Sequence, residues 1–93
     1  MPIKAYMLLN VSSGSEKEVC KKISDFDEVL DASIVYGEFD IIVKVSVENL
    51  DALETLSEKI RTITGVMMTS TMIVAREYKG RVVRNSLKIE NLK

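Results

Sequence analysis

Apolar and polar residues alternate along several segments of the chain, and alternation with a period of two predicts β-strands. The odd-numbered positions from Ile3 to Val11 are all apolar, and the odd-numbered positions from Phe39 to Val47 repeat the pattern. Val29 to Tyr36 is a third segment of strand character, while Val66 to Glu77 is rich in β-branched residues and methionine. We therefore expect four strands.

Two other segments repeat apolar residues at the spacing of an amphipathic helix. The first follows Ser15, which stands three residues before Glu18 as in a capping box. The second runs from about Leu50 to Ile63, and Gly65 stands where a left-handed C-terminal cap belongs. The apolar stripes consist of Val19, Cys20, Ile23 and Phe26 in the first helix and of Leu50, Leu53, Leu56, Ile60 and Ile63 in the second.

The order of these segments is β-α-β-β-α-β, which predicts an α+β fold of the ferredoxin-like class. Such a domain has a four-stranded antiparallel sheet with two helices on one face. Gly37 lies in the short segment between the second and third strands, as in a hairpin. We expect one domain over residues 1–77 and a basic C-terminal extension over residues 78–93, with room for a further strand around Arg81–Val83.

Two helices cover only one face of such a sheet, so the other face should be polar. The sequence departs from that expectation, because apolar residues also stand among the positions that alternate with the core set. We assign five of them to the uncovered face: Tyr6, Leu8, Ile42, Met67 and Ile73. A bare patch of this size is unusual for a monomer, so we expect two copies to pack sheet against sheet as a twofold dimer. The alternative is that these side chains are scattered or lie beneath the C-terminal extension.

Composition limits the chemistry that is open to the chain. The 93 residues include 13 Lys and Arg against 14 Asp and Glu, and this balance gives no general attraction to nucleic acid or to anionic membranes. There is no histidine, the commonest general base and nitrogen metal ligand, and the single cysteine cannot form an internal disulfide. We expect no metal, no cofactor and no catalytic residue. No apolar run is long enough to span a bilayer and no secretory signal opens the chain, so the cytoplasm is the expected location.

Two stretches of the sequence carry a family resemblance. The first is Tyr36-Gly37-Glu38-Phe39-Asp40, followed by the apolar residues 41–45. The second, residues 63–74, contains a Gly-Val pair at 65–66 and a Thr-x-Thr pattern at 69–71. Correctly spaced around the second helix, they resemble the effector domain of leucine- and asparagine-responsive transcription regulators, the RAM domain of the Lrp/AsnC family. The resemblance covers about residues 3–77.

The resemblance implies a non-catalytic sensing module in transcriptional regulation. It implies dimers that form through facing sheets and then join into tetramers, octamers or larger rings. It also implies that a free amino acid binds in the clefts between dimers, near the glycine-containing hairpin. Full-length members of the family carry an N-terminal helix-turn-helix, whereas the first strand here begins at Ile3. We therefore expect a stand-alone effector module that does not bind DNA itself and that is able to pair with a full-length relative.

The hairpin tip is the strongest candidate for a ligand site, and it comprises Tyr36, Gly37, Glu38, Phe39 and Asp40. Backbone N–H groups in such a loop suit a carboxylate, and Asp40 suits an α-ammonium group. Ordinary turn chemistry is the alternative, in which Gly37 supplies a positive φ and Asp40 accepts from a local N–H. The hydroxyls of Thr69, Ser70 and Thr71 are further candidates, and the resemblance puts the two threonines near the effector cleft. The strand propensity of threonine is the alternative there.

Two other functions compete with sensing. A dimeric ferredoxin-like monooxygenase or isomerase would use a cavity between the helices and the sheet. Such an active site generally requires a histidine or a cluster of polar groups inside the cavity. A purely structural or partner-binding module would oligomerise in the same way but would lack a cavity with convergent polar groups.

Overall fold

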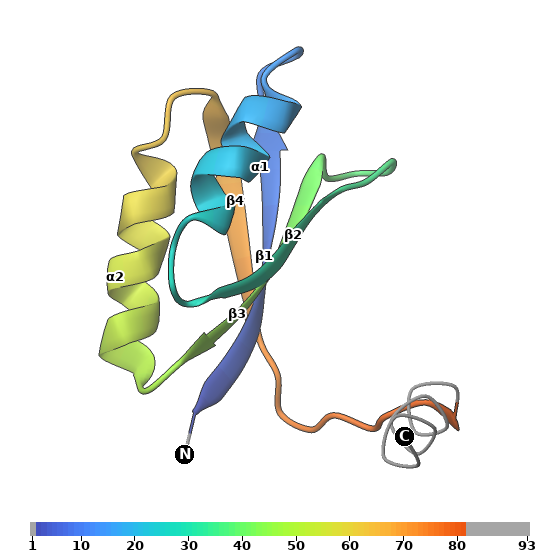
Figure 1. Ribbon diagram of the computed structural model, residues 1–93, viewed down its shortest axis with the longest axis vertical. Coiled ribbons are helices and arrows are strands. Elements are labelled where there is room, and N and C mark those ends of the chain that lie inside the picture. Colours follow the sequence, from blue (N-terminus) through green and yellow to red (C-terminus); the bar gives the residue numbers. More distant parts are fainter. Residues whose placement is uncertain (1, 82–93) are drawn as a thin grey trace, which may run out of the picture.

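A four-stranded antiparallel sheet with the strand order β2-β3-β1-β4 carries both helices on one face, as Figure 1 shows. The computed structural model describes residues 2–81. Its elements are β1 (Ile3–Val11), α1 (Glu16–Ser24), β2 (Val29–Ile34), β3 (Ile41–Val47), α2 (Leu50–Arg61) and β4 (Val66–Ile73). The expected ferredoxin-like fold is confirmed. Within the described residues, neither helix has the length and hydrophobicity needed to cross a membrane.

The core lies between the helices and the sheet, and the period of two in β1 and β3 determines its composition. The two strands pair so that Met7 is opposite Val43 and Leu9 is opposite Ile41, and all four side chains are fully buried. The helices contribute the rest of the core, which includes the fully buried side chains of Val19, Ile23, Leu56 and Ile60. Each large apolar side chain buried in this way contributes about 1.5–3 kcal/mol relative to its exposed state.

Three strand ends differ from the expected bounds. Strand β2 ends at Ile34 rather than at residue 36, and β3 begins at Ile41 rather than at residue 39. The residues between them form a six-residue connection, the β2–β3 loop (residues 35–40), in which Gly37 has a positive φ. Strand β4 ends at Ile73 rather than at residue 77, although the N–H of Val74 still donates to the carbonyl oxygen of Lys4 at 2.9 Å. The further strand suggested around residues 81–83 lies almost wholly outside the described residues, and the division at residue 77 stays a prediction.

The helix caps also differ from expectation. The capping box at Ser15 and Glu18 is wrong, because the Ser15 side chain bonds to no N–H of α1 and donates instead to the carbonyl oxygen of Ser12. The backbone of Ser15 is not in the extended conformation that an N-cap side chain requires. Helix α2 does have a side-chain cap, which the sequence analysis missed: Asn49 Oδ1 accepts from the N–H of Ala52 at 2.8 Å.

Gly65 lies in the turn after α2, where this turn packs against the start of α1. Its φ is +103°, as a left-handed position demands, but it lies three residues beyond the C-cap Thr62, in the turn before β4. Its carbonyl oxygen accepts from the N–H of Ser12 at 2.8 Å. A Cβ at this position would lie 2.9 Å from Ser15 Oγ and 3.3 Å from Val19 Cγ2. Both the backbone conformation and the neighbouring side chains therefore require glycine here.

We expect Gly65→Ala to destabilise the fold far more than Gly14→Ala. Gly14 also has a positive φ, +91°, but a Cβ there would meet nothing within 4 Å. The left-handed backbone costs an alanine about 1–2 kcal/mol, and forcing a methyl group into a packed site costs a further ~1–3 kcal/mol. Only Gly65→Ala carries both costs. Chemical denaturation of the two variants measures the difference, and equal losses would show that the contact with α1 relaxes freely.

Candidate functional site

The β2–β3 loop is held against the end of β1 by three hydrogen bonds. The N–H of Asp40 donates to the carbonyl oxygen of Leu9 at 2.8 Å, and Asp40 Oδ2 accepts from the N–H of Val11 at 2.9 Å. Asn10 Nδ2 donates to the carbonyl oxygen of Glu38 at 2.9 Å. One oxygen of the Asp40 carboxylate therefore accepts from the backbone of β1, 29 positions away in the sequence, rather than from an N–H of its own turn as the turn-chemistry alternative had it. A ligand-binding role for Asp40 stays a prediction.

The tip of this loop projects away from the sheet. Tyr36 is fully exposed, Gly37 and Glu38 are exposed, and Phe39 is half-buried. Gly37 has φ +153°, a backbone region that side chains with a Cβ rarely adopt. The loop thus presents an aromatic ring and backbone groups to whatever approaches this edge of the molecule.

The three hydroxyl residues of β4 do not face the same way. Thr69 and Thr71 are paired with core residues of β1, so both threonines point to the helix side of the sheet. Ser70 is paired with Leu8 and points to the opposite face, which carries no helix. Neighbouring positions of a strand alternate in this way. The predicted trio is therefore split between the two faces of the sheet.

Thr71 lies in a pocket of about 270 Å³ between α2 and β4, here called the α2–β4 pocket. Its lining residues are Leu50, Leu53, Glu54, Ser57, Arg61, Thr71 and Ile73. Leu50 was expected in the core stripe of its helix, yet it is 60% exposed, because it begins α2 and stands at the pocket's rim. Glu54, Ser57 and Arg61 were not among the site residues predicted from the sequence. The signal for them was their spacing of i, i+3 and i+7, which aligns them on one side of α2 beside the apolar stripe.

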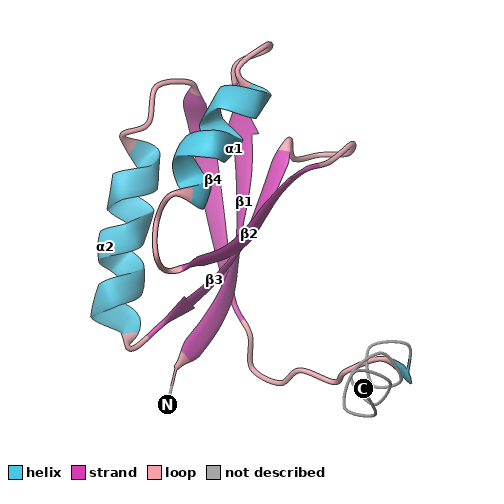
Figure 2. Ribbon diagram, in the orientation of Figure 1, coloured by secondary structure: helices cyan, strands magenta, loops and turns pink. Residues whose placement is uncertain are grey.

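The predicted ligand residues come together only in part. Thr69 is paired with Leu9, whose carbonyl oxygen accepts from the N–H of Asp40, whereas Thr71 lies farther along β4, in the α2–β4 pocket. The β2–β3 loop belongs to the side of β2, whereas α2 and β4 occupy the other side, as Figure 2 shows. One chain therefore does not bring the residues from 36 to 40 together with Thr71.

The sheet face without helices, here called the open face, carries three of the five residues assigned to it. Tyr6, Leu8 and Ile42 lie there, because they alternate with buried positions of β1 and β3. Met72 is paired with Tyr6 and joins them, and its side chain is 52% exposed. The open face is therefore apolar along its middle, as expected.

The other two assignments to the open face differ in the structure. Ile73 is paired with Ala5, a core residue, so its side chain points to the helix side. Met67 is the extra residue of an irregularity in the β1–β4 register, and Met68 takes the open-face position opposite Asn10. Both faces of β4 are rich in apolar residues. Alternation alone therefore does not show to which face of the sheet each side chain of β4 points.

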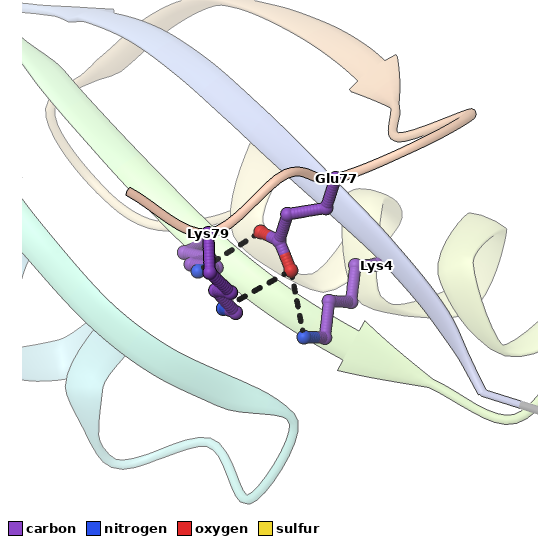
Figure 3. A network of polar contacts seen from close by, with 4 residues as sticks. Lys4, Glu77 and Lys79 are labelled. Atoms are coloured by element: carbon purple, nitrogen blue, oxygen red, sulfur yellow. Dashed lines mark hydrogen bonds and ion pairs between the residues drawn. The ribbon is translucent and has the colours of Figure 1, made fainter. Parts of the chain in front are cut away.

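A charged cluster, here called the Glu77 network, holds the segment after β4 against the open face. The Glu77 carboxylate lies 3.1 Å from the Nζ of Lys4, 3.2 Å from the Nζ of Lys79 and 3.5 Å from the Nζ of Lys44. Figure 3 shows Glu77 reaching Lys4 and Lys79. Beside this segment runs an open groove of about 610 Å³, lined on the sheet by Tyr6 and Met72.

The network changes the acidity of its members. Hydrogen bonds from Lys4 and Lys79 lower the pKa of Glu77 to about 2, from an ordinary value of 4.5. The Glu77 charge in turn raises the pKa of Lys44, whose ammonium group lies 5.9 Å from the centre of the Tyr6 ring. The open face therefore combines an apolar middle with a charged corner.

The Glu77 network should stabilise the folded state at neutral pH. This stabilisation should be lost only in strong acid. Because folding lowers the pKa of Glu77, its contribution to stability is complete above the unfolded value and disappears as the pH falls through about 2. An NMR titration of the Glu77 carboxyl group measures this midpoint. Glu77→Gln should remove this part of the acid dependence, whereas Glu58→Gln, which removes an exposed carboxylate from α2, should leave it. A midpoint near 4.5 would contradict the network.

The model of the Lrp/AsnC ligand-binding domain matches residues 4–83. The HTH-type transcriptional regulator FL11 of Pyrococcus furiosus is 31% identical over 77 residues, which is 83% of this chain and 51% of the regulator. The crystal structure of the hypothetical protein PHS023 from Pyrococcus horikoshii superposes with a TM-score of 0.74 at 42% identity, covering 82% of this chain and 93% of that one. Escherichia coli AsnC superposes with a TM-score of 0.77 at 28% identity, covering 85% of this chain and 54% of that one.

The coverage of these relatives differs in an informative way. The chain spans about half the length of the FL11 regulator and of E. coli AsnC, but nearly all of PHS023. What it shares with the two regulators is therefore one portion of each protein.

Proposed function

The chain belongs to the Lrp/AsnC ligand-binding domain family, and on that premise we propose that it is a non-catalytic effector module, which binds a free amino acid and acts as an oligomer in transcriptional regulation. The observation that carries the proposal is the family match over residues 4–83, which includes both parts of the predicted ligand site. The relatives FL11 and AsnC are named as regulators. Such a role also implies a cytoplasmic location.

The open face supports self-association. Its apolar middle consists of Tyr6, Leu8, Ile42 and Met72. Both helices of the chain pack on the other face of the sheet and therefore do not cover it. A second copy presents the same surface, so sheet-to-sheet packing around a twofold axis buries both at once. We propose that dimers of this kind join into tetramers, octamers or larger rings.

The separation of the β2–β3 loop from the α2–β4 pocket supports ligand binding between subunits. The loop that bears Asp40 and the pocket that contains Thr71 are on different sides of one chain. Larger assemblies would bring a loop of one subunit next to a pocket of another. A ligand bound between them would change the stability of the assembly, which is what an effector must do.

These 93 residues have no excess of positive charge, with 13 Lys and Arg against 14 Asp and Glu. Because neutralising phosphates dominates affinity for DNA, we propose that they do not contact DNA themselves. A full-length regulator of the same family would supply that contact as a partner.

The enzyme alternative has little support in the interior. A monooxygenase-type site would need polar groups in a cavity between the helices and the sheet, but within residues 2–81 no polar or charged side chain is buried. The purely structural alternative differs from sensing only in its response to a ligand, so an experiment separates the two.

We expect at least one amino acid to stabilise the protein or change its assembly. Binding to the folded protein alone raises its melting temperature by mass action. Each of the twenty amino acids at millimolar concentration is tested by thermal unfolding and by light scattering, with ammonium acetate as the control for ionic effects. If none of the twenty alters the melting temperature or the molar mass, sensing is wrong and the structural alternative takes its place.

We expect Leu8→Asp and Ile42→Asp each to lower the molar mass of the assembly. Both side chains lie on the open face and outside the core, so the fold should persist while the apolar contact is lost. Burying the new carboxylate without a partner would be strongly unfavourable. Ser13→Asp adds the same charge to an exposed loop and should leave the mass unchanged. Light scattering measures the mass and circular dichroism verifies folding. An unchanged mass in both open-face variants would contradict this mode of dimerisation.

A further inference from the structure

One end of the open face carries an excess of positive charge. There the Glu77 carboxylate lies among the ammonium groups of Lys4, Lys44 and Lys79, here called the lysine corner. The charge of Glu77 is the main cause that raises the pKa of Lys44, and that of Asp31, which is paired with Lys44 from β2, is the weakest. The acidic groups nearby therefore do not balance the three lysines.

The opposite end of the open face is acidic. Asn10 alternates with buried positions of β1 and so lies on this face, and its Nδ2 donates to the carbonyl oxygen of Glu38 at 2.9 Å. The β2–β3 loop therefore borders the open face there, and Figure 1 shows it at the end of the sheet away from the N-terminus. The loop contains two carboxylates and no basic residue. Asp40 accepts from the N–H of Val11, whereas Glu38 is exposed and belongs to no ion pair among residues 2–81.

The two charged ends lie at equal distances from the apolar middle. On β1, Tyr6 and Leu8 stand on either side of Met7, and Lys4 and Asn10 stand three positions from it in opposite directions. Three residues of an extended strand span about 10 Å, so each end lies roughly that far from the centre. Both ends also lie over β1 and β3, because these strands carry two of the lysines and adjoin the β2–β3 loop. The unlike charges are thus arranged symmetrically along the strands.

Twofold symmetry gives this arrangement a consequence for the proposed dimer. When a twofold axis relates two facing sheets, it lies in the plane between them. An axis along the strands would place the lysine corner of one copy on that of the other. An axis across the strands, near Met7, would place each lysine corner over the Glu38 end of the other copy. An oblique axis would leave both ends without a partner. Opposite charges favour a contact and like charges disfavour it, so electrostatics selects the axis across the strands.

We infer that Glu38 of each copy pairs with the lysine corner of the second copy, so that the β1 strands of the two copies run antiparallel across the interface. The inference rests on the dimer of the proposed function and adds to it the residues that fix its orientation. The apolar middle supplies the core of the contact, and the charged ends determine how the two sheets are placed on each other. The pairing would also hold the β2–β3 loop, which bears predicted ligand residues, against the second copy.

A double-mutant cycle between Lys4 and Glu38 tests the pairing. Lys4→Glu and Glu38→Lys should each weaken dimerisation roughly tenfold, because each places like charges opposite one another. The double variant K4E/E38K should dimerise more tightly than either single variant. The two residues stand roughly 20 Å apart at the ends of one chain's open face, too far to interact within it, so this recovery arises only between copies. Sedimentation equilibrium measures the dissociation constant, and a double variant weaker than both single variants would overturn the inference.

Controls on α2 separate this pairing from a general effect of charge. Lys59→Glu and Glu58→Lys reverse the same charges on exposed positions of the helix side and should leave the dissociation constant unchanged. Lys4→Glu also disturbs the Glu77 network of its own chain, so circular dichroism verifies folding. If that variant does not fold, Lys79→Glu replaces it in the cycle, because Lys79 belongs to the lysine corner but lies outside the sheet.

Carbodiimide coupling tests the geometry directly, because it joins a carboxylate to an amine only where the two groups are in contact. A mixture of ordinary and isotopically heavy chains distinguishes links between copies from links within one chain. Glu77 should couple to Lys4 or Lys79 within one chain and serves as the internal control. Glu38 should couple to a lysine of the corner only between copies. Coupling of Glu77 without any coupling of Glu38 to the lysine corner would contradict the inference.

The outcomes separate this inference from the proposed function. If Leu8→Asp and Ile42→Asp lower the molar mass but the charge variants act independently, the sheets pack in another orientation and only the present inference is overturned. If the open-face variants leave the mass unchanged, the proposed mode of dimerisation fails and the inference fails with it. Recovery in K4E/E38K, together with links from Glu38 to the second copy, supports both.

Discussion

The structure depends on a mismatch between the area of the sheet and the helices available to cover it. Four strands expose two faces, and helices of nine and twelve residues cover one. The covered face holds the whole core, in which Met7, Leu9 and Leu56 are fully buried. The uncovered face still carries Tyr6, Leu8 and Ile42. Because removal of apolar surface from water is the main favourable term in folding and association, this surplus is the physical basis of the proposed packing against a second copy.

The same sheet separates the chemistry of the molecule into regions. The loop that bears Asp40 is held at one side by hydrogen bonds to β1, and the charged pocket of α2 lies at the other. The middle of the open face lies between them. Because the larger assemblies proposed above would bring the loop of one subunit next to the pocket of another, ligand binding and oligomerisation would become coupled. This coupling is the physical basis on which the proposed module would act as a sensor.

The Glu77 network adds an electrostatic constraint to the apolar one. It joins the segment after β4 to lysines of β1 and β3, so the chain leaves the sheet across one corner of the open face. Three ammonium groups surround one carboxylate, which leaves an excess of positive charge beside the apolar middle. A partner surface that packs here has to accommodate this charge as well as the apolar side chains. The network therefore restricts which surfaces fit and in which orientation.

The sequence by itself determined the order of elements, the fold and most of the core, because alternation in β1 and β3 and the helical spacing of Val19, Ile23, Leu56 and Ile60 are local signals. Local signals failed where two faces of one strand are equally apolar: the side of Ile73 depends on its register against Ala5, which no short segment encodes. The pocket likewise needed the tertiary structure, because it joins Glu54 and Arg61 of a helix to Thr71 of a strand. The Glu77 network joins residues 73 positions apart. Pattern determines which elements form and which sides they bury, whereas packing and register decide which distant side chains meet.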